Sequence, residues 1–521
     1  MLGRTIALAA LVTVASSFEP ASAQTFPVED PVLRRIWTRG MDSSRVATLA
    51  QALSDSIGPR LTGSPQLRAA QQWILARYKE WGIAAREERY GTWKGWRRGY
   101  THVDLIAPRP RTLDATLLAF SPGTTRPVEG TVVIVPPVES RQAFDVWLPS
   151  VRGKFVLSVA PEIACRPDES LERWTTGETR ARIRQQRDSI AEAWSARSLA
   201  SALDAAGLQT ALEKAGAAGI LVHRWSGGWG ADRVFSTSTT RAPVLQLSCE
   251  DYGLIYRLAE RGQGPRLRVD ARSQSLGEVP VFNVLGEIRG SEKPDEYVML
   301  SAHLDTWDGA SGATDNATGT VMMMEAMRLL KQTYPSPRRT ILVGHWAGEE
   351  QGLNGSRAFV ADHPDIVNGI QILLNQDNGT GRVTRIGMHG FTEAGSFFGR
   401  WVARLPSEIS TDLELDIPGT PSEGGSDHAA FVCAGAPAVR MAAEGADYQT
   451  YTWHTTLDTY DKIIVDNVKR NAVMAAMLAY LASEEAEKLP RDRRLMTANG
   501  NDASWPTCRK PRRSSTEPRA R

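Results

Sequence analysis

Hydrophobic and polar positions change their spacing along the chain. In the C-terminal half, apolar runs of strand length alternate with longer stretches whose apolar residues recur every three to four positions. The pattern predicts strands within residues 296–305, 338–350, 368–377 and 435–441, and helices over residues 318–332 and 467–489. Because strands alternate with helices, we predict an α/β fold with a central mixed, mostly parallel sheet flanked by helices.

Two other patterns precede this half. Residues 30–81 have helical spacing, with a cap and a first-turn proline at Ser64-Pro65. We expect residues 24–124 to be the N-terminal part of a domain that resumes at residues 277–487. Residues 125–272 contain short apolar runs bounded by Gly or Pro, which predict an inserted β-rich domain. Its charged stretch at 166–215 predicts a helical insertion with a solvated face, and a lid over the site is the alternative.

The two ends of the chain differ from the rest. Residues 1–23 combine Arg4, an apolar run and the exit Ala21-Ser22-Ala23, so we predict a signal peptide and an exported protein, secreted or periplasmic. The apolar run is shorter than the ~20 residues that cross a membrane, and no later stretch predicts a membrane span. Residues 488–521 are rich in Arg, Pro and Ser, and we predict a flexible tail.

Composition excludes little. Hydrophobic residues make up 42% of the 521 residues, and the formal charge of +2 gives no reason to expect a nucleic-acid partner. The four cysteines form no CxxC pair. We expect Cys165 to pair with Cys249, since both fall in the inserted domain, although the spacing leaves the pairing open. The oligomeric state also stays open, a homodimer included.

Polar groups gather after the predicted strands of the C-terminal half. In an open α/β sheet, functional groups collect outside the carboxyl ends of the strands. Each group alone has an ordinary explanation, such as a helix cap or a surface charge, and the set is what predicts a site. The set consists of His303, Asp305, Asp315, the pair Glu349-Glu350, Asp377 and His454.

Imidazoles and carboxylates together are the ligands expected for zinc. Side chains of consecutive residues in extended backbone point in different directions. One of Glu349 and Glu350 can therefore bind metal while the other acts as general base towards a water. Asp305 follows His303 by two residues, and we expect its carboxylate to orient the imidazole through the second ring nitrogen.

Three motifs resemble a known family. "HLDTWDGASGATDNATG", "GEEQGLNGS" and "HTTLDTYDKI" are similar to the co-catalytic di-zinc exopeptidases, which include secreted bacterial aminopeptidases, carboxypeptidase Q and glutamate carboxypeptidases. The resemblance covers about residues 45–125 and 277–485, and "LEKAGAAGILVHR" resembles the protease-associated domain often inserted in these enzymes.

The resemblance implies a zinc exopeptidase fold and two zinc ions per chain. Asp315 would bridge the ions, Glu349 would be the base and Asp305 would orient a ligand. The remaining ligands would be His303 and Asp377 for the first ion and Glu350 and His454 for the second.

The match to the family departs at one position. Some relatives have a tyrosine immediately before the last histidine, where this chain has Trp453, and Tyr448 or Tyr451 could replace it. The resemblance also implies that Ser426 and Asp427 of "EGGSDHAAF" contact substrate. We expect the two further histidines, His428 and His345, to be structural.

We therefore expect an aminopeptidase or dipeptidase that acts on peptides or dipeptides. A carboxypeptidase of the glutamate carboxypeptidase type is the first alternative. A non-catalytic receptor-like module on the same fold is the second, although no ligand position is lost. A serine hydrolase using Ser426 and His428 lacks the GxSxG elbow and leaves the acids unexplained.

Overall fold

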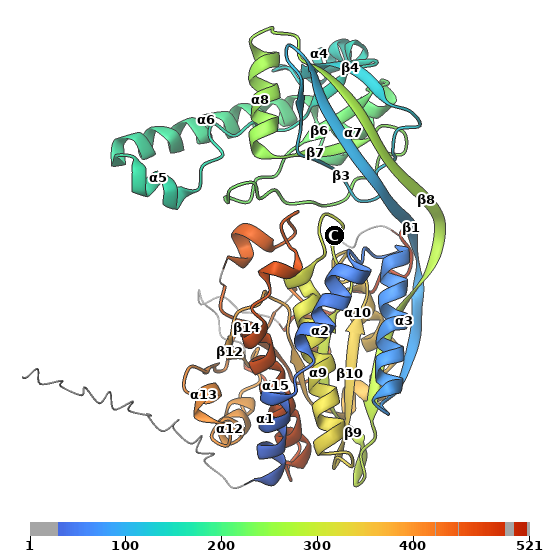
Figure 1. Cartoon of the computed structure of the whole chain (residues 1–521), viewed down its shortest axis with the longest axis vertical. Coiled ribbons are helices and arrows are strands. Elements are labelled where there is room, and N and C mark those ends of the chain that lie inside the picture. The colour runs from blue at the N-terminus through green and yellow to red at the C-terminus, as the bar shows by residue number, and fades with distance from the viewer. Residues whose placement is uncertain (1–29, 423, 446, 495–504, 518–521) are drawn as a thin grey trace, which may run out of the picture.

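The protein folds into two lobes joined by a long two-stranded ribbon (Figure 1). The structure is a computed structural model and describes residues 30–422, 424–445, 447–494 and 505–517. The predicted signal peptide at residues 1–23 lies outside the described residues.

The lower lobe in Figure 1 contains the predicted α/β sheet. Its strands are β9 (Lys293–His303), β10 (Arg339–Trp346), β11 (Ile370–Asn375), β12 (Val383–Gly387), β13 (Glu414–Asp416) and β14 (Ala438–Ala443). Strand β9 lies between β10 and β11 and is parallel to both, and β11 is parallel to β14. Strand β12 is antiparallel to β14. The mixed, mostly parallel sheet is thus confirmed.

Helices cover this sheet. They are α1 (Pro31–Asp42), α2 (Val46–Gln51), α3 (Pro65–Glu80), α9 (Thr318–Thr333), α10 (Asn354–Asp362), α11 (Pro364–Gly369), α12 (Ala394–Val402), α13 (Ser407–Ser410), α14 (His428–Cys433) and α15 (Val465–Glu484). Ser64 caps α3 and Pro65 starts it, as the sequence predicts. Helices α9 and α15 are buried along most of their length, and the methionines of α9 pack in the core.

The ribbon consists of β1 (Ala84–Ala107) and β8 (Arg266–Ile288). They pair antiparallel from Ala84 opposite Glu287 to Ala107 opposite Arg266. The lower end of β8 also pairs with β10, and its upper end pairs with β4 (Val128–Ile134). The sequence predicted only short strands here, because a ribbon that crosses between lobes has charged runs such as residues 86–89 within it and no continuous alternation.

The upper lobe is a mixed α/β unit. Strands β4, β5 (Phe155–Leu157), β6 (Gly219–Val222) and β7 (Val244–Leu247) are parallel neighbours, and β3 (Ala115–Leu117) pairs antiparallel with β7. A short β2 (Arg111–Thr112) pairs with β1. The helices are α4 (Arg141–Trp147), α5 (Asp168–Trp174), α6 (Gly177–Ser201), α7 (Ala205–Lys214) and α8 (Cys249–Glu260).

The upper lobe contains more helix than the sequence predicted. The prediction of a β-rich domain missed α8 and the parallel strand order, and the lobe includes β3, which precedes residue 125. The predicted helical insertion at 166–215 consists of α5, α6 and α7, and α6 projects outward from the lobe (Figure 1). The likeness of the lobe to a protease-associated domain stays a prediction.

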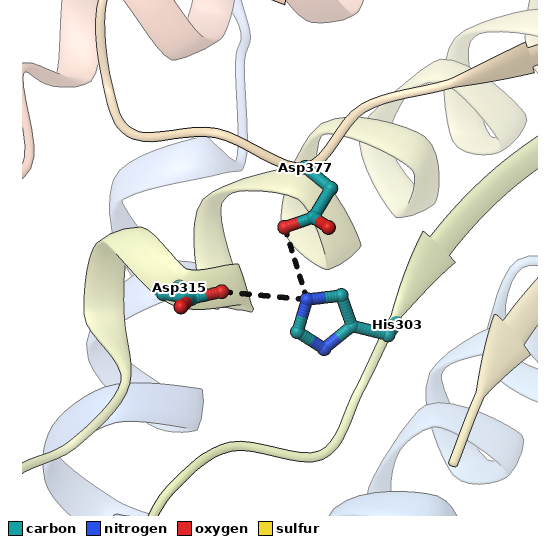
Figure 2. A group of neighbouring side chains, drawn as sticks. All are labelled: His303, Asp315 and Asp377. Atoms are coloured by element: carbon teal, nitrogen blue, oxygen red, sulfur yellow. Dashed lines mark hydrogen bonds and ion pairs between the residues drawn. The ribbon is translucent and has the colours of Figure 1, made fainter. Parts of the chain in front are cut away.

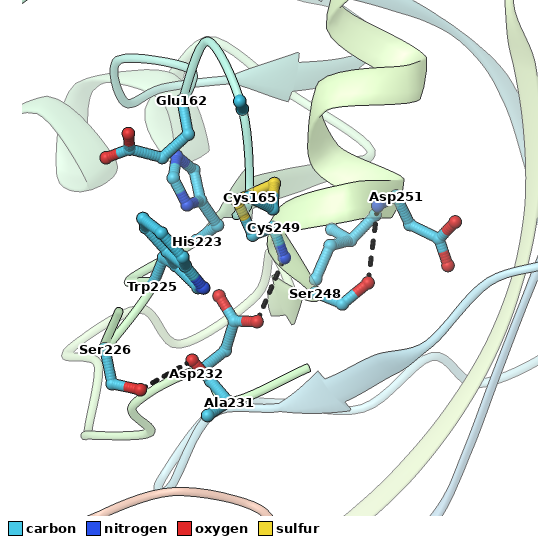
Figure 3. Close-up of a disulfide and its surroundings, with 12 residues drawn as sticks. Glu162, Cys165, His223, Trp225, Ser226, Ala231, Asp232, Ser248, Cys249 and Asp251 are labelled. Atoms are coloured by element: carbon cyan, nitrogen blue, oxygen red, sulfur yellow. Dashed lines mark hydrogen bonds between the residues drawn. A yellow bond between two sulfur atoms is a disulfide. The ribbon is translucent and has the colours of Figure 1, made fainter. Parts of the chain in front are cut away.

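Two disulfides tie distant segments together. The expected Cys165–Cys249 bond is confirmed and joins the loop after β5 to the start of α8 (Figure 3). A second bond joins Cys433 at the end of α14 to Cys508, a pairing that the spacing did not indicate.

The second disulfide changes the view of the C-terminal segment. Within the predicted flexible tail at 488–521, residues 505–517 are attached to the body rather than free. The indole of Trp505 donates a hydrogen bond to the carbonyl oxygen of Val432, and the carbonyl oxygen of Arg513 accepts from the backbone N–H of Thr92. Among the described residues, no helix has the length and apolar character of a membrane-spanning segment.

Candidate metal centre and active site

Three neighbouring parallel strands bring polar residues to one edge of the sheet. Strand β9 ends at His303, β11 ends two residues before Asp377, and β10 ends at Trp346, shortly before Glu349 and Glu350. Parallel strands release their following segments at the same edge, so these side chains meet although they are far apart in sequence.

The first group of side chains consists of His303, Asp315 and Asp377 (Figure 2). The Nε2 atom of His303 lies 3.0 Å from Oδ1 of Asp377 and 3.4 Å from Oδ1 of Asp315. All three side chains are buried. One imidazole nitrogen and two carboxylate oxygens thus face a common point.

The second group shares one member with the first. The Nε2 atom of His454 lies 3.1 Å from Oδ2 of Asp315 and 3.0 Å from Oε2 of Glu350. Asp315 therefore presents one carboxylate oxygen to each histidine. The structure brings all five predicted ligands into one cluster centred on Asp315.

The cluster fits divalent metal ions. In each group of three, the candidate ligand atoms lie within 4.8 Å of one another. Oxygen Oε1 of Glu350 is buried and has no hydrogen-bond partner among the described residues, an arrangement that costs free energy unless a cation satisfies it. Imidazole nitrogens with carboxylate oxygens are a zinc donor set.

The electrostatics of the cluster favour cations. Burial lowers the pKa of His303, but the carboxylates of Asp377 and Glu349 outweigh this and raise it well above its ordinary value. For His454 burial likewise acts downward, and Glu350 with Asp315 raises the pKa to about 10. Positive charge is therefore stabilised at both imidazoles. A metal ion that binds there displaces the imidazole protons and takes over their charge.

Glu349 and Glu350 diverge from a turn rather than from the extended backbone that we expected. Strand β10 ends at Trp346, and Gly348 has a φ of 76°, a conformation that glycine adopts without strain. Glu350 reaches His454. Burial raises the pKa of Glu349 well above its ordinary value, the His303 imidazole opposes this, and the Asp377 carboxylate adds to it. Glu349 is thus on the His303 side of the cluster.

Asp305 acts differently from the prediction. Atom Nδ1 of His303 lies 2.9 Å from the backbone carbonyl oxygen of Asp305 and 3.9 Å from its carboxylate. The carboxylate instead accepts hydrogen bonds from the backbone N–H groups of Glu349 and Glu350, at 3.1 and 3.3 Å, and from the hydroxyl of Thr62 at 3.0 Å. The chain turns directly after His303, so the backbone carbonyl of Asp305 contacts the imidazole. The Asp305 carboxylate is then available to hold the Glu349-Glu350 turn.

The predicted contacts in "EGGSDHAAF" lie inside the domain. Ser426 is fully buried and its hydroxyl oxygen accepts a hydrogen bond from the side-chain amide of Asn375 at 2.9 Å. Asp427 is also fully buried, and burial raises its pKa to about 7. Both ring nitrogens of His428 lack partners among the described residues, so Ser426 and His428 form no nucleophile–base pair.

His345 also lies away from the cluster. Its Nε2 atom is 2.7 Å from the hydroxyl of Tyr78, and both side chains are buried. Burial lowers the pKa of His345 to about 3, so the imidazole is neutral.

Tyr448 and Tyr451 occupy different environments. Tyr448 packs against Gly379 close to the cluster, and burial raises its pKa well above its ordinary value, to which Asp315 and Asp377 contribute. Tyr451 instead packs against Gly228 of the upper lobe. Trp453, which stands at the position of the family tyrosine, stacks on His454 with ring centres 4.1 Å apart.

Sequence reasoning missed Asp458. Its carboxylate accepts hydrogen bonds from the backbone N–H groups of Thr314 and Asp315, at 2.8 and 3.0 Å, and so fixes the bend that carries Asp315. Asp458 follows His454 by four residues within the quoted motif "HTTLDTYDKI", and that proximity to a proposed ligand was the available signal.

The contribution of the upper lobe was also missed. The backbone N–H of Val234 donates to the carbonyl oxygen of His454 at 2.7 Å. The ring of Phe235 meets the His454 imidazole edge to face, with centres 5.1 Å apart. A segment more than 200 residues earlier in the chain thus holds His454, and no local pattern indicates such a contact.

Comparisons with known proteins agree with this architecture. Residues 283–479 match the model of Peptidase family M28. The chain is 25% identical to carboxypeptidase Q of Rattus norvegicus over 439 residues, which cover 84% of this chain and 85% of the relative.

Two solved structures have a similar fold. A peptidase M28 precursor from Shewanella amazonensis aligns with a TM-score of 0.63 and 23% identity, covering 89% of this chain and 98% of the other. A zinc aminopeptidase from Bacillus subtilis aligns with a TM-score of 0.55 and 16% identity, covering 87% and 97%. All five members of the cluster lie within residues 283–479, the part of the chain that matches Peptidase family M28, and the match together with the cluster identifies a zinc metallopeptidase.

Proposed function

We propose that the chain is a di-zinc exopeptidase that hydrolyses the terminal bond of a peptide or the bond of a dipeptide. The observation that carries the proposal is Asp315, whose two carboxylate oxygens face two separate histidine-containing groups. His303 and Asp377 would complete one ion site, and Glu350 and His454 the other. When bound, two zinc ions supply Lewis acidity to the attacking water and to the scissile carbonyl.

Glu349 is the proposed general base. It accepts the proton of the attacking water and passes it to the leaving amine. In the metal-free chain, burial and the neighbouring carboxylates raise the pKa of Glu349, which favours its holding a proton taken from water. The carboxylate of Asp305 positions Glu349 by accepting a hydrogen bond from the backbone N–H of Glu349. Tyr448, buried beside the cluster, is the tyrosine better placed to interact with the developing oxyanion, since Tyr451 packs on the other lobe.

The direction of attack and the compartment belong to the same proposal. The rat relative is named a carboxypeptidase and the Bacillus neighbour an aminopeptidase, and a dipeptide satisfies both modes. Two disulfides are typical of an oxidising compartment, which supports export to the periplasm or medium.

The test replaces Glu349 by Gln, which keeps the size of the side chain and removes the base. We expect kcat on a dipeptide to fall about 10²–10⁴-fold with unchanged zinc content. Glu260→Gln, at the exposed end of α8, is the matched control and keeps full activity. Chelation of the wild-type protein abolishes hydrolysis and added zinc restores it. Near-normal turnover in Glu349→Gln with both ions bound would show that another group is the base.

A further inference from the structure

A large cavity opens between the lobes beside the metal cluster. Its volume is about 930 Å³, and Glu350 and His454 form part of its wall. The upper lobe contributes residues around His223 and Phe235, and the ribbon contributes Lys94. A peptide bound to the cluster therefore has part of its length against the upper lobe.

The wall of this cavity has an uneven charge. Its cations are Lys94, Arg224 and Arg512, whereas its carboxylates are Glu350, which belongs to the cluster, and Asp204. Asp204 is engaged as the cap of α7, where its carboxylate accepts from the N–H of Gly207 at 2.7 Å. Outside the metal cluster, the described wall is suited to an anionic group rather than to an ammonium group.

Arg224 stacks on an aromatic ring that itself contacts the cluster. Its guanidinium lies over the face of Phe235, with Cζ 4.5 Å from the ring centre. The same phenyl ring contacts the imidazole of His454 edge to face. One phenyl ring thus separates the guanidinium from a metal ligand. The stacking uses the flat face of the guanidinium, and among the described residues its N–H groups donate no hydrogen bond.

Arg224 sits on a braced loop. Its carbonyl oxygen accepts from the N–H of Arg233 at 2.8 Å, and the N–H of Ser226 donates to the carbonyl oxygen of Ala231 at 3.0 Å. Asp232 then binds the N–H of Cys249 at 2.9 Å beside the Cys165–Cys249 disulfide (Figure 3). A guanidinium held on a rigid loop loses less conformational entropy when it binds a ligand.

We propose that Arg224 binds the α-carboxylate of the substrate residue on the leaving side of the scissile bond. The inference rests on the proposed exopeptidase function and assigns its direction, namely carboxypeptidase or dipeptidase action. A guanidinium pairs with a carboxylate through two parallel hydrogen bonds. Consecutive Cα atoms are about 3.8 Å apart. A single leaving residue is therefore long enough to extend from the metal cluster past the Phe235 ring to Arg224. Lys94, which the ribbon contributes to the same cavity, adds positive charge.

The test compares three substrates: the dipeptide Ala-Leu, its amide Ala-Leu-NH2, and N-acetyl-Ala-Leu. The amide lacks the carboxylate and keeps the free amine, whereas the acetylated dipeptide has the reverse pattern. For the wild-type protein we expect hydrolysis of Ala-Leu and at least about tenfold lower kcat/KM for the amide. Hydrolysis of N-acetyl-Ala-Leu distinguishes carboxypeptidase action, which needs no free amine, from dipeptidase action, which does.

Arg224→Gln should lower kcat/KM about 10–100-fold, mainly through KM, for the carboxylate substrates that the wild-type protein hydrolyses, and leave the amide unchanged. Arg261→Gln, an exposed arginine in the same lobe outside the cavity wall, should change none of them. Because a folding defect would lower all three substrates together, the pattern across substrates separates recognition from a structural effect.

Each other outcome has a definite meaning. If the wild-type protein cleaves Ala-Leu-NH2 as well as Ala-Leu, or if Arg224→Gln affects both equally, the assignment of Arg224 is overturned while the exopeptidase function stands. If Arg224→Gln instead lowers kcat/KM only for Ala-Glu-NH2, added as a fourth substrate, the arginine binds an acidic side chain and the α-carboxylate assignment is overturned. If no peptide is hydrolysed by the zinc-loaded wild-type protein, the proposed function itself fails.

Discussion

The two halves of the metal cluster are built differently. His303 is the last residue of a buried central strand and is 1% exposed, and its partner Asp377 follows the neighbouring strand. His454 instead lies eleven residues after β14, has a φ of 59°, and forms part of the cavity wall. The first half is therefore fixed by the sheet, whereas the second half is fixed by contacts with another lobe.

The difference shows that one half of the cluster is fixed in the core of the sheet, whereas the other half faces the cavity between the lobes. The half on the sheet is held by a ladder of backbone hydrogen bonds, which opens only with the core. The half at the cavity has a left-handed histidine whose carbonyl oxygen accepts from Val234 of the upper lobe. The cavity between the lobes therefore adjoins the ligand set at the half that contacts with the upper lobe hold in place.

The largest expected effect comes from the residue that both halves share. Asp315→Asn removes the charge that faces both histidines, so we expect loss of both ions and a fall in activity of more than about 100-fold, since outer partners alone cost about 10–100-fold. Metal analysis after dialysis measures it. Retention of one full ion would show that the halves are independent and that Asp315 is no bridge.

A smaller effect is expected at Asp305. Its carboxylate supports the Glu349-Glu350 turn, and its backbone carbonyl supports His303. Asp305→Asn should therefore lower kcat about 10–100-fold and keep the first ion, because the carbonyl is unchanged. Combined kinetics and zinc titration test this, with Thr62→Val as a milder variant. Loss of the ion at His303 would show that the Asp305 carboxylate orients the His303 imidazole, as the sequence suggested.

The contact between the lobes should affect the second half alone. Val234→Pro removes the N–H that donates to His454, whereas Val234→Ala keeps it. One such hydrogen bond contributes about 0.5–1.5 kcal/mol, so we expect up to about tenfold weaker binding of one ion and activity that excess zinc restores. Equal weakening of both ions, or equal effects of the two variants, would contradict the division into halves.

The last effect is on stability and not on activity, and it concerns His345, which lies on the same sheet away from the cluster. Burial lowers the pKa of His345 to about 3, so the unfolded chain binds the proton more readily, and this stability is present above pH 6.5 and lost as pH falls towards 3. Metal-free wild-type protein should lose up to about 1.4 kcal/mol per pH unit more than His345→Gln in this window. Urea unfolding at pH 7.5 and 5.0 compares them. Parallel losses would show that His345 titrates normally.

The sequence indicated the first half well for a physical reason. The strands that end near His303 and Asp377 are apolar runs with a clear length, and parallel neighbours place their ends together. The motif around Glu349-Glu350 added the proposed base and a further candidate ligand. The core strands and the helices α3, α9 and α15 could be predicted in the same way, because the spacing of their apolar residues along the sequence indicates which face is buried.

The remaining features depend on contacts that no local pattern encodes. The ribbon of β1 and β8 gains its pairing from a strand about 180 residues away, and the Cys433–Cys508 bond joins segments 75 positions apart. The roles of Asp305 and Asp458 follow from which backbone N–H groups come near their carboxylates. The burial of Ser426 and Asp427 could not be predicted, because a polar loop sequence does not reveal that the domain closes over it, and their contact with substrate stays a prediction.

The most direct test of the account is the anomalous diffraction of zinc-loaded crystals at the zinc absorption edge. We predict two peaks in each chain, about 3.5–4 Å apart, one beside His303 and one beside His454, with the Asp315 carboxylate between them. A single peak, or two peaks that do not share Asp315, would contradict the bridged cluster.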